Sequence, residues 1–474
     1  MSAVSVANKQ KTSKAASQAA HEEKQKRRRI RQTKRTRPEP AEQKEKFSWK
    51  NFFTLAKGSD PWITAVTVIL IVFGMIMVIS TKQGTTIGDT RGFLIEVIKQ
   101  LMFLIVAWEF GVVYLSRHYP YGLFNYKSMQ NMLIAGYTIV LVLVALVGTE
   151  AGGSKAWLRL FGGLTIQPSE FGKPLLIILL ASAARFAGMK KKAKSGEPVS
   201  FFRMFSRPLI LMGISIIFIG GLQKDFGSLI ITLGIGLVGL LVTSDENIEK
   251  WQRIILISFL VILIILIIGI YFSDIFVRLF SDTPLLRHIA IRIENMQDPY
   301  ANIHSQGYQP ANALYSLADS GIFGKGLGNS VRKYGFLTQA ESDYILAIVV
   351  EETGIIGLGL ISICYAILLW RLAHWALAAR KPYDKVLFSC SAAYFMLHFF
   401  INVGGVSTLI PMTGVPLLMI SAGGSALISA CMVIGICQNR IARLVHDEKL
   451  RLAQKETLRE RIEESDEDLV YEDS

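Results

Sequence analysis

Residues 254–272 read IILISFLVILIILIIGIYF, an apolar run without a charged residue. A helix needs about 20 apolar residues to cross the hydrocarbon core of a bilayer, so this stretch predicts a membrane-spanning helix. Nine other apolar runs predict helices of the same kind. They cover residues 62–80, 93–115, 131–148, 169–187, 208–221, 228–243, 344–370, 386–403 and 416–437. The sequence therefore predicts an all-α polytopic membrane protein with about ten transmembrane helices.

The composition excludes several other classes of protein. The chain has 474 residues, of which 51% are hydrophobic and 19% charged, and its formal net charge is +14. These values exclude a disordered chain, a collagen-like repeat and a disulfide-stapled miniprotein. A charge of +14 would suit nucleic-acid binding, but most of the excess lies in the N-terminal tail and not on a folded surface. We therefore expect no nucleic-acid partner.

Basic residues also predict the orientation in the membrane. Segments rich in Lys and Arg follow the even-numbered spans, so the positive-inside rule places these segments and both termini in the cytoplasm. Residues 1–58 are expected to be a basic, disordered cytoplasmic tail, and residues 439–474 a charged cytoplasmic tail. Residues 59–438 are expected to form the membrane domain, with a large extracytoplasmic loop over residues 273–342.

This extracytoplasmic loop is far longer than a typical connection, and loops of such length usually carry function. Apolar residues recur at helical spacing over residues 286–296, which predicts an amphipathic helix at the membrane interface. The helix is expected to end at Asp298-Pro299. Farther along, residues 324–328 (GKGLG) could cradle a phosphate, although a lone glycine-rich run is a weak signal.

Several ionisable residues fall at membrane depth, where charge is costly. They are Glu170, Lys173, Asp225, Glu351 and Glu352. We expect each to face a polar cavity or to pair with another. Ion pairs that only hold the helices together are the alternative interpretation.

Four ordered motifs give the chain a family resemblance between about Trp62 and Cys437. They are Gln167-Pro168-Ser169-Glu170 with Lys173; Asp298-Pro299 with Gly307-Tyr308-Gln309; Gly326-Leu327-Gly328-Asn329-Ser330 with Asp343 and Glu351-Glu352; and residues 410–416 with 421–425. With these motifs the chain resembles the SEDS family (shape, elongation, division and sporulation proteins). It looks most like the division branch, with the elongation and sporulation branches close.

The chain also departs from the family pattern. Lys224 stands where the family usually has Pro, and Thr338-Gln339 replaces a frequent Pro-Glu. Leu418-Met419 and Ala422 replace the usual Pro-Phe and Tyr. These departures weaken the assignment to one branch.

The resemblance implies a peptidoglycan glycosyltransferase of the bacterial cytoplasmic membrane. Such an enzyme polymerises lipid II, an undecaprenyl-pyrophosphate-linked disaccharide peptide, at the outer face of the membrane. The implied partners are a class B penicillin-binding protein, components of the divisome at the division septum, and membrane lipid. The alternatives are an elongation-type polymerase, a lipid II flippase, and a catalytically silent scaffold.

Joining two lipid-linked disaccharides needs a base for the attacking hydroxyl and cations for the departing pyrophosphate. Asp298 matches the catalytic Asp of the family and follows the interfacial helix, so we predict that it deprotonates the acceptor 4-hydroxyl. An α-linked donor that yields a β-linked strand indicates inversion in a single step. The alternative for Asp298 is an Asp-Pro turn that ends a helix.

The remaining candidates are predicted to contact substrate. Lys155, Arg159, Lys173 and Lys333 are candidates for the pyrophosphate, because Lys and Arg bind such oxygens strongly. Trp157 is expected either to stack on a sugar or to belong to the interfacial aromatic belt. The resemblance adds Gln167, Ser169, Glu170, Asp225, Gln309 and Ser330. A divalent cation (Mg or Mn) is an option at the pyrophosphate, but no dense carboxylate cluster requires one.

A transporter would also suit many spans and intramembrane charges. The polar motifs and the long loop nevertheless belong to the expected outer side, whereas alternating access needs a site near the midplane. This asymmetry favours the enzyme.

Overall fold

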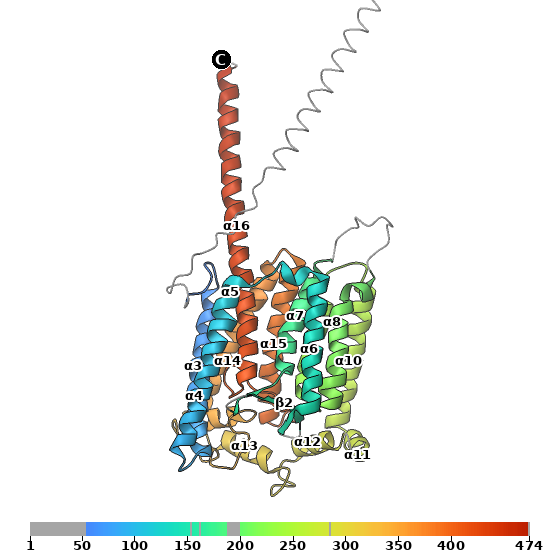
Figure 1. Ribbon diagram of the computed structural model, residues 1–474, viewed down its shortest axis with the longest axis vertical. Helices are drawn as coiled ribbons and strands as arrows, with labels where there is room; N and C mark the ends of the chain where they lie inside the picture. Colours follow the sequence, from blue (N-terminus) through green and yellow to red (C-terminus); the bar gives the residue numbers. More distant parts are fainter. Residues whose placement is uncertain (1–53, 152–153, 161–162, 187–199, 284–285, 473–474) are drawn as a thin grey trace, which may run out of the picture. The chain divides into compact units, whose positions relative to one another are not determined.

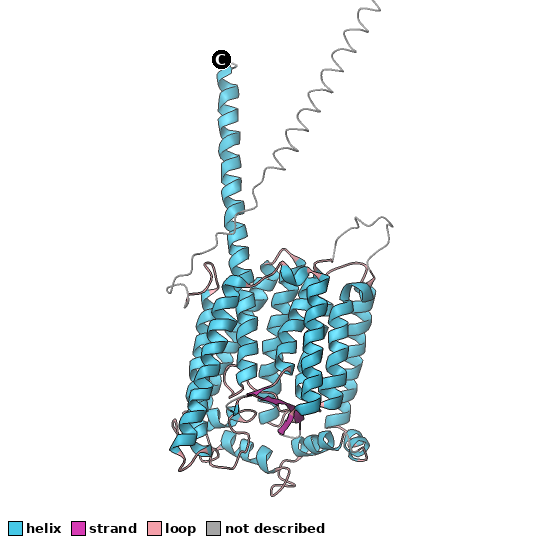
Figure 2. Cartoon of the chain, viewed as in Figure 1, coloured by secondary structure: helices cyan, strands magenta, loops and turns pink. Residues whose placement is uncertain are grey.

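The computed structural model describes residues 54–151, 154–160, 163–186, 200–283 and 286–472. Of residues 460–472 it describes the helical backbone alone. Most of the predicted N-terminal tail, residues 1–58, lies outside the described residues. Helices make up nearly all of the regular structure (Figure 2).

Each of the ten apolar runs falls wholly or in part on a helix of the described chain. The helices are α3 (Pro61–Thr85), α4 (Thr90–Val106) with its continuations η1 (Ala107–Tyr114) and α5 (Leu115–His118), η2 (Leu123–Asn125), α6 (Lys127–Val147), α7 (Ser169–Ala184), α8 (Phe201–Ser215) with its continuation η4 (Ile216–Leu222), α9 (Phe226–Val242), α10 (Glu249–Tyr271), α14 (Ile345–Ala378), α15 (Pro382–Val406) and α16 (Gly424–Glu472). Within the described residues, 7 helices are long and apolar enough to cross a membrane. The all-α polytopic fold is confirmed, while the count of ten spans stays a prediction.

Small elements gather at one end of the bundle, the lower end in Figure 1. They are α11 (Ile275–Ser281), α12 (Arg287–Gln297), α13 (Tyr308–Ala318) and the strands β1 (Thr149–Ala151), β2 (Ser154–Arg159) and β3 (Thr165–Ile166). The strands form an antiparallel sheet in the order β1-β2-β3, with Leu158 opposite Ile166. The short α5, which ends in Arg117 and His118, lies at the opposite end. The basic end of α5 and the predicted outer loop therefore lie at opposite ends of the bundle, the arrangement that the positive-inside rule predicts for them.

Helix starts follow ordinary capping chemistry. The Asp60 carboxylate accepts the backbone N–H groups of Trp62 (2.9 Å) and Ile63 (3.2 Å), and Pro61 occupies the first turn of α3. Asp225 caps α9 in the same way by accepting the N–H of Ser228 at 3.0 Å. This capping aspartate thus fixes the outer start of α9.

Burial separates central from peripheral helices. In the most apolar window of α16, 94% of the residues are buried, whereas in α10 only 6% are. We conclude that α16 lies in the centre of the bundle and that α10 lies on its rim, where lipid covers an all-round apolar surface.

Two predicted boundaries differ from the structure. The run over residues 416–437 is helical only from Gly424, and residues 411–423 form turns and irregular backbone. At the other end, α16 continues unbroken past residue 438. Arg440 is buried there, donates to Asp384 at 2.7 Å and lies 4.1 Å from the Tyr121 ring centroid. The bundle therefore holds this helix beyond the predicted start of the tail.

Helix α14 contains a break at Gly354, which has φ 68° and ψ −161°. The freed carbonyls of Glu351 and Glu352 accept the N–H groups of Lys325 and Gly326, each at 2.9 Å. A Cβ at Gly354 would lie 2.2 Å from the carbonyl oxygen of Ile322. This close backbone contact ties the outer loop to α14.

We expect Gly354→Ala to destabilise the protein by about 2–4 kcal/mol, because it adds both a strained φ and a backbone clash. Thermal unfolding in detergent measures this loss. Gly359→Ala is the matched control, since it lies in the same helix with nothing within 4 Å of its added Cβ. A Gly354→Ala variant as stable as this control would contradict the packing described.

Candidate functional site

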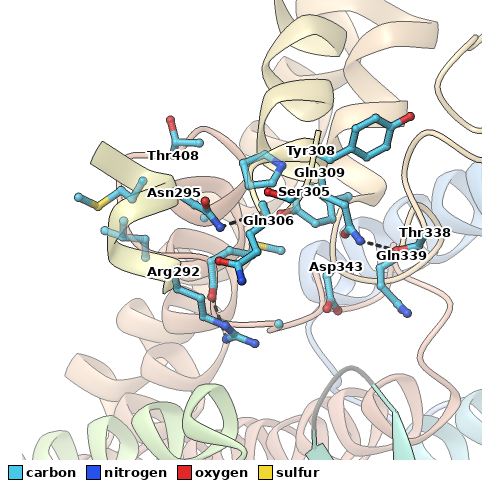
Figure 3. Close-up of a pocket in the computed structure, with 17 residues that line it drawn as sticks. Arg292, Asn295, Ser305, Gln306, Tyr308, Gln309, Thr338, Gln339, Asp343 and Thr408 are labelled. Carbon is cyan, nitrogen blue, oxygen red and sulfur yellow. Dashed lines mark hydrogen bonds between the residues drawn. The ribbon is translucent and has the colours of Figure 1, made fainter. Parts of the chain in front are cut away.

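Three adjoining cavities lie among the outer elements. The first, of about 390 Å³, lies between α12, α13 and the end of α15 and is shown in Figure 3. Many polar side chains take part in its lining, beside apolar ones such as Met296 and Ile410. They include Arg292, Asn295, Ser305, Gln306, Gln309, Thr338, Gln339, Asp343 and Thr408. Amide, hydroxyl and carboxylate groups in such number suit a hydroxyl-rich ligand.

The second and third cavities continue from the first. The second, of about 200 Å³, shares Arg292, Asp343 and Gln339 with the first. The third, of about 360 Å³, shares Trp157 and Gln339 with the second. Gln339 thus lines all three cavities, which adjoin one another at this residue and are called the row below.

Hydrogen bonds from distant helices fix the wall that these cavities share, the segment 339–344. Asn402 on α15 donates to the backbone carbonyl of Asp343 at 2.9 Å and to that of Val415 at 2.8 Å. Ser421 donates to the carbonyl of Ser342 at 2.8 Å. The segment is therefore held in one conformation between α15 and the residues that precede α16.

Asp343 has an unusual electrostatic environment. Burial raises the pKa of its carboxyl to about 6, and the Arg292 guanidinium opposes this rise while the Asp225 carboxylate adds to it. Arg292 itself donates to the backbone carbonyl of Met412 at 2.8 Å. The Asp343 carboxyl is therefore harder to ionise than that of an ordinary aspartate.

Asp298, the predicted base, follows the end of α12 and is exposed. Its Oδ1 accepts the backbone N–H groups of Tyr300 (3.0 Å) and Ala301 (3.1 Å). This is the Asp turn considered as the alternative from the sequence. Asp298 does not line any of the three cavities, although Asn295 and Met296 of the same helix line the first. Its catalytic role stays a prediction.

Five of the predicted substrate residues do line the cavities. Trp157, Gln167 and Asp225 line the second, Arg159 lines the third together with Trp157, and Gln309 lines the first. Gln167 donates to the Asp225 carboxylate at 2.7 Å and so joins the start of α7 to that of α9.

Other predicted substrate residues serve the protein's own structure. The Nζ of Lys155 donates to the carbonyls of Ala145 (3.0 Å) and Leu146 (3.3 Å) at the end of α6. Buried Ser330 donates to Glu351 at 2.6 Å, and the Nζ of buried Lys333 lies 3.1 Å from Glu352. None of these three predicted residues lines a cavity of the row, so substrate contact by them stays a prediction.

Glu170 and Lys173 form a buried pair inside the bundle, with Nζ 2.6 Å from Oε1. Lys173 also lies 3.4 Å from the Nε2 of His398 on α15. The pairing expected for these two residues is confirmed. Among the described atoms, the Glu170 Oε2 and the Ser169 Oγ have no hydrogen-bond partner. Their substrate roles stay predictions.

The structure adds residues that the sequence did not single out as a site. Arg292 was only a polar position on an amphipathic helix, and Asp343 only a member of a motif. Gln339 was a departure from the family pattern. Arg292 meets the other two because α12 packs against the segment 339–344, and no local spacing encodes that contact.

The described residues include no group of three or more His, Cys, Asp or Glu side chains that could hold a metal ion. The protein's own side chains therefore do not supply a metal cage in this part of the chain. The divalent cation stays a prediction.

Comparison with known proteins agrees with this fold. The chain is 29% identical over 390 residues to the probable peptidoglycan glycosyltransferase FtsW of Bacillus subtilis, covering 81% of this chain and 91% of that protein. It is 29% identical over 382 residues to the stage V sporulation protein E of the same organism, covering 80% and 96%.

Two solved structures share the fold at 20% sequence identity. One was described as a peptidoglycan synthase complex that coordinates polymerization and crosslinking, with a TM-score of 0.58 over 81% of this chain and 98% of that one. The other is the rod shape determining protein RodA of Thermus thermophilus, with a TM-score of 0.51 over 81% and 97%. The model of the cell cycle proteins FtsW, RodA and SpoVE matches residues 61–445. The SEDS resemblance is thereby confirmed, and the chain belongs to the FtsW/RodA/SpoVE family of cell cycle proteins.

Proposed function

We propose that this protein is a peptidoglycan glycosyltransferase that polymerises lipid II at the outer face of the bacterial cytoplasmic membrane. The row of three cavities, each with several polar and charged side chains in its lining, carries the proposal. It lies at the end of the bundle that holds the predicted outer loop, and its polar walls adjoin helices long enough to meet lipid tails. Two lipid-linked head groups can meet there while their chains remain in the membrane.

The reaction proceeds by a single displacement. Asp298 takes the proton of the acceptor 4-hydroxyl, and the freed oxygen attacks the anomeric carbon of the donor. The bond from that carbon to the pyrophosphate oxygen breaks, and undecaprenyl pyrophosphate leaves with the electron pair. The two backbone N–H groups on Oδ1 orient the Asp298 carboxylate, so Oδ2 is the oxygen that receives the proton.

Cations near the row stabilise the leaving pyrophosphate. Arg159 is the best placed of the predicted pyrophosphate contacts, because it lines the third cavity together with Lys82 and Lys99. Lys82 and Lys99 both pair with Glu96, at 3.3 Å and 2.9 Å. Arg159 has no such ion pair among the described residues, so its charge is available to an anion.

The partner is a class B penicillin-binding protein that cross-links the new strands, and the place is the division septum. The likeness to a synthase complex that couples polymerization with crosslinking supports the partner. The description of the family as cell cycle proteins supports the septum. The N- and C-termini lie in the cytoplasm, as the charge pattern predicts.

A flippase is the second candidate, because the buried Glu170–Lys173 pair is the kind of intramembrane charge that transporters use. One assay separates the two. The purified protein receives labelled lipid II in detergent, with and without a partner whose transpeptidase site is disabled. In parallel, vesicles report lipid II movement across the bilayer. Glycan polymer supports the enzyme, whereas movement without polymer overturns it.

A further inference from the structure

Asp343 occupies the junction of the first two cavities and lines both. In Figure 3, Arg292 approaches this junction from α12, and Asp343 approaches it from the segment before α14. Asp343 is the only carboxylate in the lining of the first cavity among the described residues. A ligand that fills either cavity therefore meets this side chain.

The Asp343 carboxyl lies beside the Ser342 side chain, whose hydrogen bond favours the ionised form, and it still lines both cavities. Gly414, with φ 74°, lies opposite, and a Cβ at this position would lie 3.3 Å from Oδ2. The backbone of Asp343 is fixed by Asn402, so the carboxylate does not depend on a mobile turn. Asp298, by contrast, stands in an exposed turn.

The charged groups around Asp343 come from several elements. Arg292 belongs to α12, and Asp225 precedes α9. Lys224 and His288 line the second cavity with them. No described residue forms an ion pair with the exposed Lys224, and Arg292 is bound to a carbonyl. The site is thus a half-buried carboxylate near two cations, Lys224 and Arg292. Neither forms an ion pair with Asp343 in the described part of the chain.

We infer that Asp343 is a second substrate-contacting carboxylate, which in its ionised form accepts a hydrogen bond from a hydroxyl of the acceptor sugar. This inference rests on the proposed function and adds a residue to it. A carboxylate is acceptor-only and binds sugar hydroxyls well, whereas its protonated form gives up part of that capacity. The contact would hold the acceptor sugar between the first two cavities, and α12, which Asp298 follows, contributes Asn295 and Met296 to the first of them.

The inference predicts the direction of the pH dependence. The pKa of Asp343 is raised to about 6 by burial, so the carboxyl is ionised above that pH and protonated below it. Sugar binding should therefore weaken as the pH falls through about 6. Because the ionised group is costly to bury, removing its charge should not lower the melting temperature at alkaline pH.

The test measures lipid II binding and polymerisation by the full chain in nanodiscs, at about pH 5 and about pH 8. The variants are Asp343→Asn and Asp343→Glu, with Asp282→Asn as a control on an exposed residue at the end of α11. We expect wild type and the control to bind lipid II more tightly at the higher pH. The Asn variant should bind about 10- to 100-fold more weakly there and lose the pH dependence.

Other results of the same experiment distinguish a failure of the Asp343 inference from a failure of the polymerase proposal. The Asp343→Glu variant should retain pH-dependent binding, because it keeps the charge. The binding assay tests Asp343 even if no polymer forms, in which case the polymerase proposal alone fails. Binding by Asp343→Asn with wild-type strength and pH dependence would overturn the inference. If this variant unfolds, pH-independent binding by wild type would overturn it equally.

Discussion

Asp298→Asn should lower the rate of glycan polymerisation by about 10²- to 10⁴-fold, the usual contribution of a general base. The amide is nearly the same size as the carboxylate but cannot take the proton of the acceptor hydroxyl. Its oxygen still accepts the N–H groups of Tyr300 and Ala301, so the turn after α12 should persist. The melting temperature should stay unchanged, since Asp298 is exposed. Turnover of labelled lipid II measures the loss.

Two comparisons make the Asp298 result specific. Asp282→Asn removes another exposed carboxylate of the outer loop and should leave the rate unchanged. Asp298→Glu keeps a base on a longer side chain and should retain more activity than the Asn variant. Polymerisation by Asp298→Asn at the wild-type rate would contradict the assignment of this residue as the base.

Lys173→Met should destabilise the protein by about 3–5 kcal/mol, because it leaves the Glu170 carboxylate buried without its partner. Lys173 and Glu170 are each at most 1% exposed, so neither charge can reach water to offset the loss. Thermal unfolding in detergent measures the effect as a lower melting temperature.

The double variant Glu170→Gln/Lys173→Met distinguishes the effect of an unpaired buried charge from the effect of losing the Lys173 side chain itself. Since it removes both charges, it should recover much of the stability that the single variant loses. Lys250→Met, on an exposed position at the start of α10, controls for loss of a lysine. If Lys173→Met had the same melting temperature as Lys250→Met, the buried ion pair would not contribute to the stability of the helix bundle.

The sequence was most informative about the helices. Apolar runs such as 254–272 fall on helices because membrane insertion depends on local hydropathy. For the run at 416–437 the predicted start of the helix was wrong. Residues 416–423 are largely apolar, but the helix begins only at Gly424. Hydropathy reports burial in this segment and not its backbone conformation.

The site was less predictable, because it depends on contacts between distant segments. Lys333 was predicted to contact the pyrophosphate and Ser330 to contact substrate, yet they pair with Glu352 and Glu351, which precede the break at Gly354. Lys224 has φ 56°, which a proline ring cannot adopt, so the backbone here must differ from relatives that carry Pro. Trp157 and Asp225 were found from the sequence, since both belong to recognisable outer motifs.

The linkage of the product tests the central claim most directly. An inverting polymerase that uses an α-linked lipid donor must produce a β-linked glycan. The purified protein is incubated with lipid II, and the product is digested with a muramidase that cleaves β-linked strands alone. We predict a polymer that this enzyme reduces entirely to short fragments. A polymer that resists digestion, or no polymer from a folded preparation with its partner present, would contradict the claim.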